Sequence, residues 1–153
     1  MSFSLSGQVT IEQLLDKGYE HYIEDEFDLA IKKFDQAAIA DPTNPENYFL
    51  RGLSYHGMKK KKKGINDLEK AIELAPDYVE AYQELGYIYL VGQAPKLAIE
   101  QFDKALDLDP TAAEVYVNRG TAKCMLDNPE GARKDWDKAM ELGVQYSEYM
   151  KCE

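Results

Sequence analysis

The side chains that could do chemistry in this sequence of 153 residues are two histidines, two cysteines and many carboxylates. His21 and His56 could bind a metal ion, and Cys124 and Cys152 could act as nucleophiles, provided that further ligands or a base lay nearby. The sequence contains none of the motifs HExxH, CxxC, GxSxG or GxGxxG, which would supply such partners at a fixed spacing. We therefore expect no catalytic residue, no metal site and no cofactor, and predict that the protein is not an enzyme.

Each of these candidates also has a simpler explanation. His21 and His56 fall at different phases of the helices predicted below, so they are not expected to face one metal ion. Cys124 has apolar neighbours and is predicted to be a small buried side chain, whereas Cys152 is predicted to be exposed. Their separation along the chain does not suggest a disulfide framework or a metal knuckle, so a reducing compartment is expected.

The composition excludes several classes of protein. Lys and Arg number 18 and Asp and Glu number 28, which gives a net charge of −10. Because this charge repels phosphate backbones and anionic membranes, neither nucleic acid nor a membrane is expected as a partner. The hydrophobic content of 44% is typical of a soluble globular protein, and 153 residues favour one domain. The start, MSFSLSGQVT, has no basic residue or long apolar run, so a cytoplasmic location is predicted.

Small residues recur through the sequence with a period of 34. The pattern is a glycine, an alanine twelve residues later, another alanine seven residues after that, and a proline five residues further on. Four copies match this pattern, apart from Gly64 and Val144. The glycines are Gly18, Gly52, Gly86 and Gly120. Small side chains at these places let antiparallel helices approach closely, and the proline ends the second helix of each copy.

Each copy reads as a pair of helices. In the third copy, Ala98, Phe102 and Leu106 have the spacing of one apolar helix face. Pro95 would lie in the first turn of that helix, where its missing N–H costs nothing. The first helices are predicted near residues 11–24, 45–58, 79–91 and 113–126, and the second helices near 28–40, 62–74, 95–108 and 129–142.

Segments such as YFLRGLSYHG, YQELGYIYLVG and LAIEQFDKALDLDP resemble the two-helix unit of the tetratricopeptide repeat family. The resemblance covers residues 11–146. It divides them into units 11–44, 45–78, 79–112 and 113–146, between an N-terminal tail, 1–10, and a C-terminal tail, 147–153. It implies an all-α fold, a right-handed superhelical stack of four antiparallel helix hairpins. It also implies that the chain acts as an adaptor or scaffold, because members of this family share an architecture for binding other proteins and do not share a reaction.

The first helices of such a stack line its concave face. The residues three before, one after and four after each glycine share one stripe of these helices, and we predict that they form a groove for a peptide or helix. The predicted groove residues are Leu15, Tyr19, Tyr22, Phe49, Leu53, His56, Gln83, Tyr87, Leu90, Val117 and Thr121, with Cys124 at the end of the stripe. For each of them, packing against the next repeat is the alternative.

The predicted partner is another protein that offers an apolar or a basic segment. A ladder of glutamates recurs every 34 residues at Glu12, Glu46, Glu80 and Glu114. These side chains either form an acidic rim or simply favour the first turn of each helix. Members of the family grip the C-terminal carboxylate of heat-shock chaperones with Lys, Asn and Arg. Because Leu15, Tyr19 and Gln83 stand on the corresponding face here, binding of that kind is not expected.

Five consecutive lysines, Lys59–Lys63, lie where the first helix of the second copy ends and its second helix begins. Gly64 replaces the usual alanine directly after them, so this turn is predicted to be the loosest of the four. A charge run of this kind is usually a solvated loop. The alternative function is that of a regulatory or nucleic-acid-associated protein that acts through these lysines.

The last predicted helix would show an apolar face with Trp136, Ala139 and Met140 if nothing followed it. Tyr146, Tyr149 and Met150 could fold back over this face. The alternative is that a second copy of the chain covers it in a homodimer.

Overall fold

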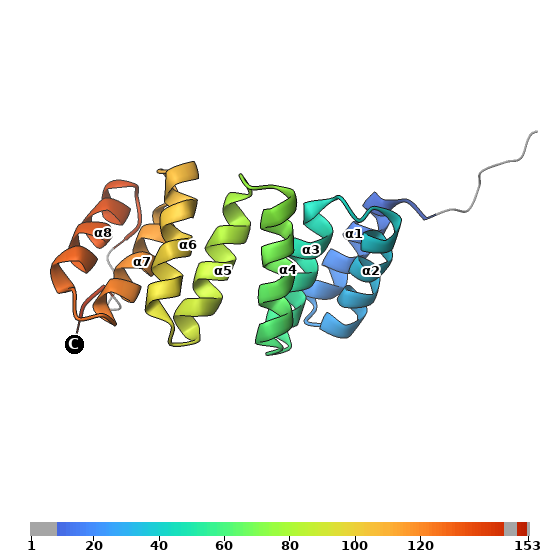
Figure 1. Cartoon of the computed structure of the whole chain (residues 1–153), viewed down its shortest axis with the longest axis horizontal. Coiled ribbons are helices and arrows are strands. Elements are labelled where there is room, and N and C mark those ends of the chain that lie inside the picture. The colour runs from blue at the N-terminus through green and yellow to red at the C-terminus, as the bar shows by residue number, and fades with distance from the viewer. Residues whose placement is uncertain (1–8, 146–149, 153) are drawn as a thin grey trace, which may run out of the picture. The chain divides into compact units, whose positions relative to one another are not determined.

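The computed structural model describes residues 9–145 and 150–152, and every regular element in this part of the chain is an α-helix (Figure 1). The helices are α1 (Ile11–Ile23), α2 (Phe27–Ala40), α3 (Pro45–Gly57), α4 (Lys61–Leu74), α5 (Val79–Val91), α6 (Pro95–Leu108), α7 (Ala113–Cys124) and α8 (Pro129–Glu141). These bounds confirm the predicted helices to within two residues. No helix in the described part is long and apolar enough to cross a membrane.

The helices form two compact units rather than the single one that the length favours. Unit 1 extends to Ala75 and holds α1–α4, and unit 2 begins at Pro76 and holds α5–α8. In unit 1, α1 packs on α2, α3 packs on α4, and α2 also contacts α3; the same scheme holds for α5–α8 in unit 2. Each repeat in such a chain contacts only its neighbours. The number of compact units therefore cannot be inferred from the length of the chain.

An apolar side chain sixteen residues after each repeating glycine fills the space that the glycine leaves. Phe34, Phe102 and Trp136 lie where a Cβ atom on Gly18, Gly86 and Gly120 would be. Leu68 lies 3.1 Å from the Cβ position of Gly52. Phe34, Leu68 and Phe102 are completely buried. Glycine is therefore required at these positions, because a large side chain of the second helix packs directly against the backbone of the first helix.

Tyrosines at one repeated position connect the first helices to the preceding proline loops. The hydroxyl groups of Tyr48, Tyr82 and Tyr116 donate hydrogen bonds of 3.1, 3.3 and 3.2 Å to backbone carbonyls. The acceptors are the carbonyls of Pro42, Pro76 and Pro110, in the same order. Each proline loop is therefore held to the helix that follows it.

An arginine on every second repeat joins three helices. Arg51 on α3 donates through Nε and Nη2 to the two carboxylate oxygens of Asp67 on α4, both at 2.7 Å. Its Nη1 donates to Asp35 on α2, also at 2.7 Å. The hydrogen bonds to Asp67, above all, raise the pKa of Arg51 further. This bidentate arrangement fixes α2, α3 and α4 of unit 1 to one another.

Unit 2 contains the same network with one addition. Arg119 on α7 binds Asp135 on α8 at 2.7 and 2.9 Å and Asp103 on α6 at 2.6 Å. Lys123 also contacts Asp135, at 2.8 Å. Within the part of the chain that the structure describes, Asp135 is thus paired with two cations, whereas the corresponding Asp67 is paired with one.

The cysteine prediction is wrong, because Cys124 and Cys152 form a disulfide with their Cα atoms 5.4 Å apart. Met150, close to the second cysteine, is buried against Trp136 and Ala139 of α8. The end of the chain therefore covers the apolar face of α8, which was one of the two alternatives. Tyr146 and Tyr149 lie outside the described residues. A sequence separation alone could not show that the chain returns to α7, and the disulfide removes the cysteine argument for a reducing compartment.

Candidate functional site

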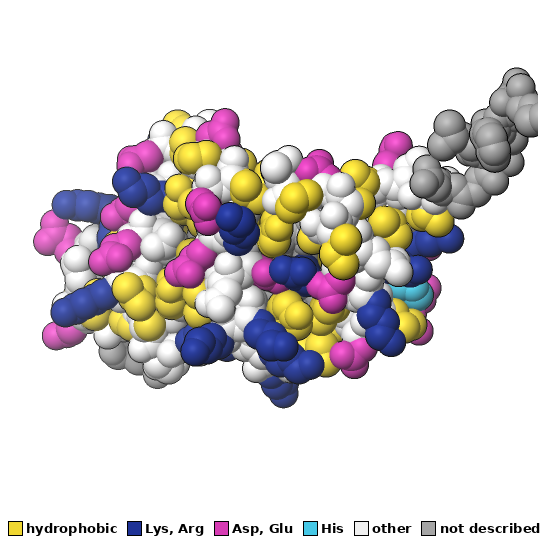
Figure 2. Space-filling view, turned by 45° about the vertical axis from the view of Figure 1, so that its right-hand side comes forward, with side chains coloured by type: hydrophobic (Ala, Val, Ile, Leu, Met, Phe, Trp, Pro, Cys, Tyr) yellow, Lys and Arg dark blue, Asp and Glu magenta, His cyan; other side chains and the backbone are white. Residues whose placement is uncertain are grey.

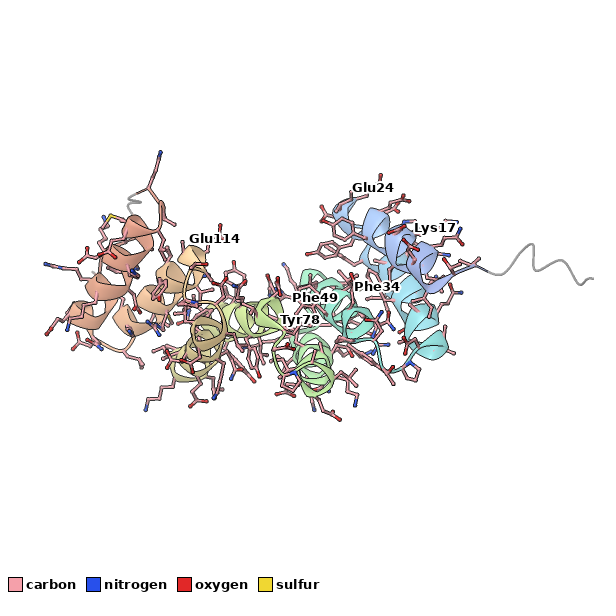
Figure 3. The ribbon with its side chains drawn as sticks, turned by 90° about the horizontal axis from the view of Figure 1, so that it is seen from above. Lys17, Glu24, Phe34, Phe49, Tyr78 and Glu114 are labelled. Atoms are coloured by element: carbon pink, nitrogen blue, oxygen red, sulfur yellow. A yellow bond between two sulfur atoms is a disulfide. The ribbon has the colours of Figure 1, made fainter. Side chains whose placement is uncertain are left out.

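The predicted groove residues lie on the first helices, which are neighbours within each unit: α1 and α3 in unit 1, and α5 and α7 in unit 2. We call the surfaces formed by these pairs the first-helix faces. In unit 1, Leu15, Tyr22, Phe49 and Leu53 are half-buried and pack against the core around Phe34, as Figure 3 shows for Phe49. Most of the apolar stripe of unit 1 therefore supports the core and shows only part of its surface.

Tyr19 is the most exposed groove residue in unit 1. Its side chain is 51% exposed, and its ring stacks on that of Tyr22 with centroids 6.1 Å apart. The Tyr22 ring in turn lies 5.8 Å from that of Phe27 on α2. This aromatic row offers a ligand the face of Tyr19, which packing against Tyr22 and Phe27 holds in place.

A hollow of about 240 Å³ marks the first-helix face of unit 2. Its lining combines residues of α5 and α7: Gln83, Glu84, Tyr87, Glu114, Val115 and Asn118. Gln83 and Tyr87 belong to the predicted stripe, and Tyr87 is 42% exposed. Two carboxyl groups, two amides and a tyrosine therefore meet in a space of side-chain size, which suits a cationic or amide-bearing group of a ligand.

Glu84 is the electrostatically unusual residue of this hollow. Burial raises the pKa of its carboxyl group above the ordinary value. Among the described residues Glu84 forms no ion pair, and its partly buried charge is not balanced by a cation of the chain. A bound cation would relieve this cost.

Three groove predictions are changed by the structure. Leu90 is only 7% exposed and lies in the core cluster of unit 2, so it is not available to a ligand and its assignment was wrong. Val117 packs against the cluster around Trp136, and its carbonyl accepts hydrogen bonds from Trp136 Nε1 and Thr121 Oγ1. Cys124 belongs to the disulfide. The stripe on α7 thus turns toward α8 and the chain end.

His56 lies near the end of α3, next to Gly57, whose Cβ position the Phe27 ring of the aromatic row occupies. It is half-buried, and burial, together with the charge of Lys61, lowers its pKa. Its imidazole is therefore neutral at physiological pH. No group of three His, Cys, Asp or Glu side chains in the described part could hold a metal ion.

Glu84 and Asn118 were missed by the sequence analysis, and Glu114 was considered only as a member of the glutamate ladder. A signal was present, because Glu84 precedes Tyr87 by three residues and Asn118 follows Glu114 by four. Each pair therefore shares a helix face, and the stripe should have been one position wider.

Comparison with known proteins agrees with this fold. The family model for the tetratricopeptide repeat matches residues 45–78 and 79–111. The STIP1 homolog of Dictyostelium discoideum is 33% identical over 79 residues, which are 51% of this chain and 14% of that protein. Small glutamine-rich tetratricopeptide repeat-containing protein 2 of Saccharomyces cerevisiae is 30% identical over 76 residues, 50% of this chain and 22% of that protein. The chain thus spans less than a quarter of the length of either relative.

Solved structures match over a longer range. A crystal structure of MamA covers 87% of this chain and 78% of its own, with a TM-score of 0.82 and 27% identity. The first TPR of Spaghetti (RPAP3), bound to the HSP90 peptide SRMEEVD, covers 76% of this chain and 93% of its own, with a TM-score of 0.73 and 25% identity. The repeat matches, the relatives and the paired helices agree: residues 45–111 of this chain match tetratricopeptide repeats, and its described part has the all-α helical-hairpin fold of solved tetratricopeptide repeat structures.

Proposed function

We propose that this chain is a non-catalytic adaptor that binds a segment of another protein on its first-helix faces. The observation that carries the proposal is the hollow of unit 2, where an unbalanced Glu84 lies beside the exposed ring of Tyr87. The relatives named above support an adaptor role, since one of the matching structures holds a peptide.

The chemistry of the hollow favours a basic segment. Glu84 and Glu114 would attract a lysine or arginine side chain, while Tyr87 would contact its aliphatic stem or an adjacent apolar residue. In unit 1, Tyr19 would contact an apolar residue of a ligand. The acidic peptide SRMEEVD of the matching structure carries the opposite charge, so we do not expect it to occupy the hollow of unit 2.

Replacing Glu84 with glutamine should weaken the binding of a basic peptide about ten-fold, because a charged hydrogen bond to the ligand is worth roughly 1.5–3 kcal/mol and glutamine keeps only part of it. The measurement is fluorescence anisotropy with a labelled short peptide of alternating lysine and leucine. Glu100→Gln on α6 removes the same charge outside the first-helix face and should leave the affinity unchanged. Equal affinities for the Glu84→Gln variant and the wild type would refute the assignment.

The same binding should depend on pH. Since burial raises the pKa of Glu84 above the ordinary glutamate value of 4.5, acidification should neutralise this group and weaken binding at a pH above that value. Because burial raises the pKa of Glu84 in the folded state, protonating this one group adds to stability rather than opposing the fold. Circular dichroism at each pH checks the fold, and this step should be missing in the Glu84→Gln variant.

A further inference from the structure

The most concentrated charge of unit 1 is the lysine turn, Lys59–Lys63, between α3 and α4. Figure 1 shows this turn at the lower ends of α3 and α4, and Figure 2 shows a group of Lys and Arg side chains at the lower edge of that view. Lys60–Lys63 line a shallow hollow of about 490 Å³. Within the described residues none of the five forms an ion pair, although other lysines of this acidic chain do, including Lys70, Lys123 and Lys138.

The backbone of the lysine turn is held in a defined geometry. Lys59 N–H and Lys60 N–H donate to the carbonyls of His56 and Tyr55 at 2.8 and 2.9 Å, and the ammonium of Lys63 lies 5.2 Å from the centroid of the Tyr55 ring. Gly64 is buried, and a Cβ atom there would lie 3.0 Å from the Gly52 carbonyl oxygen. The glycine therefore serves a close approach of α3 and α4, in contrast to the loose turn that the sequence suggested.

The positive charges of this turn interact unfavourably with the dipole of α4. Lys61, Lys62 and Lys63 occupy the first turn of α4, where the helix dipole favours anions. The first turn contains no acidic residue, and the N-cap, Lys60, makes no side-chain hydrogen bond to it. Of the other second helices, α2 and α8 carry Asp28 and Glu130 in their first turns, whereas α6 carries no acidic residue there but has one lysine, Lys96, in place of three. The N–H groups of Lys63 and Gly64 donate to the carbonyl of Lys60, so a bound anion would accept hydrogen bonds from the N–H groups of Lys61 and Lys62 and pair with the ammonium groups. Positions that break a local rule at a cost in stability often serve a function.

An acidic turn in the same unit limits the size of that anion. The connection of α1 and α2 carries Glu24, Asp25 and Glu26. It lies beside the end of α3, because the Phe27 ring occupies the Cβ position of Gly57. A long polyphosphate chain that followed the edge of unit 1 would meet these carboxylates, whereas a short acidic segment would not.

We propose that the lysine turn is a second docking site, which binds a short acidic segment of a partner protein. It lies at the α3–α4 turn and does not use the hollow of unit 2, so it is independent of the function proposed above. The ligand is held by the ammonium groups of Lys60–Lys63 and by the first N–H groups of α4.

The double variant Lys61→Gln/Lys62→Gln tests this site, with a fluorescein-labelled hexaglutamate peptide as the probe. We expect binding to the wild type that weakens with added salt, and a loss of about ten-fold in the variant, since each charge contributes up to about a factor of five. The variant should also denature at a higher temperature than the wild type, because it removes cations from the N-terminus of α4. Lys32→Gln/Lys33→Gln on α2 makes the same change in net charge and should bind like the wild type.

Three outcomes would overturn the proposal. The first is equal hexaglutamate binding by the wild type and the Lys61→Gln/Lys62→Gln variant, and the second is no binding to either protein at low salt. The third is tighter binding of single-stranded oligothymidylate than of hexaglutamate, which would assign the turn to nucleic acid. The Glu84→Gln variant should keep hexaglutamate binding, so a failure here is distinguishable from a failure of the first-helix face.

Discussion

Replacing Arg51 with methionine is expected to lower the free energy of unfolding of unit 1 by roughly 3 kcal/mol. The carboxylate of Asp67 would lose the one cation that pairs with it among the described residues, while remaining mostly buried, since its side chain is 12% exposed. Methionine keeps much of the aliphatic volume, so the loss reports on the unpaired charge. Urea denaturation followed by circular dichroism measures the change.

The corresponding change in unit 2 provides the matched control. Arg119→Met should cost less than Arg51→Met, because Lys123 still pairs with Asp135. The double variant Arg51→Met/Asp67→Leu should recover most of the lost stability, since no buried charge is then left without a partner. A greater cost for Arg119→Met than for Arg51→Met would contradict this account of the two networks.

Replacing Phe102 with alanine should destabilise unit 2 by about 3–5 kcal/mol, the range for truncating a fully buried aromatic side chain. The Phe102 ring is completely buried and fills the space above Gly86. The only tryptophan of the chain, Trp136, lies in unit 2, so its fluorescence during urea denaturation follows this unit specifically.

A double-mutant cycle with Gly86 tests the cause. Gly86→Ala alone should cost about 1–3 kcal/mol, because its Cβ atom would overlap with the Phe102 ring. In the Phe102→Ala background the same change should cost much less, since the overlapping ring has been removed. Additive costs would show that the two residues do not share the space that the structure assigns to them.

The helices and their pairing could be predicted because the signals are local and repeated. The period of the glycines, the prolines after α2, α4 and α6 and the apolar spacing on α6 each depend on residues close in sequence. Because the pattern occurs in four copies, a position that departs from it in one copy can still be assigned from the other three. The Arg51 and Arg119 networks were missed because each joins helices whose contacting residues lie sixteen positions away on both sides.

The candidate site was predicted only in part. A stripe drawn by helix period identified Tyr19, Gln83 and Tyr87, but it could not show that Leu90 faces the core. The exposure of a residue depends on how far the helix is rotated against its neighbours, and packing decides that rotation. Glu84 drew no attention in the sequence because its unusual pKa arises from burial in the folded chain.

The disulfide between Cys124 and Cys152 makes the end of the chain a covalent ring that contains the whole of α8. A single cut by trypsin inside this ring, for example after an exposed lysine such as Lys134, would cleave the backbone without releasing a fragment, because the disulfide still joins the two pieces. The nicked molecule should migrate as one band in a denaturing gel and separate into two only when a thiol is added. Digestion patterns of this protein must therefore be compared with and without reductant.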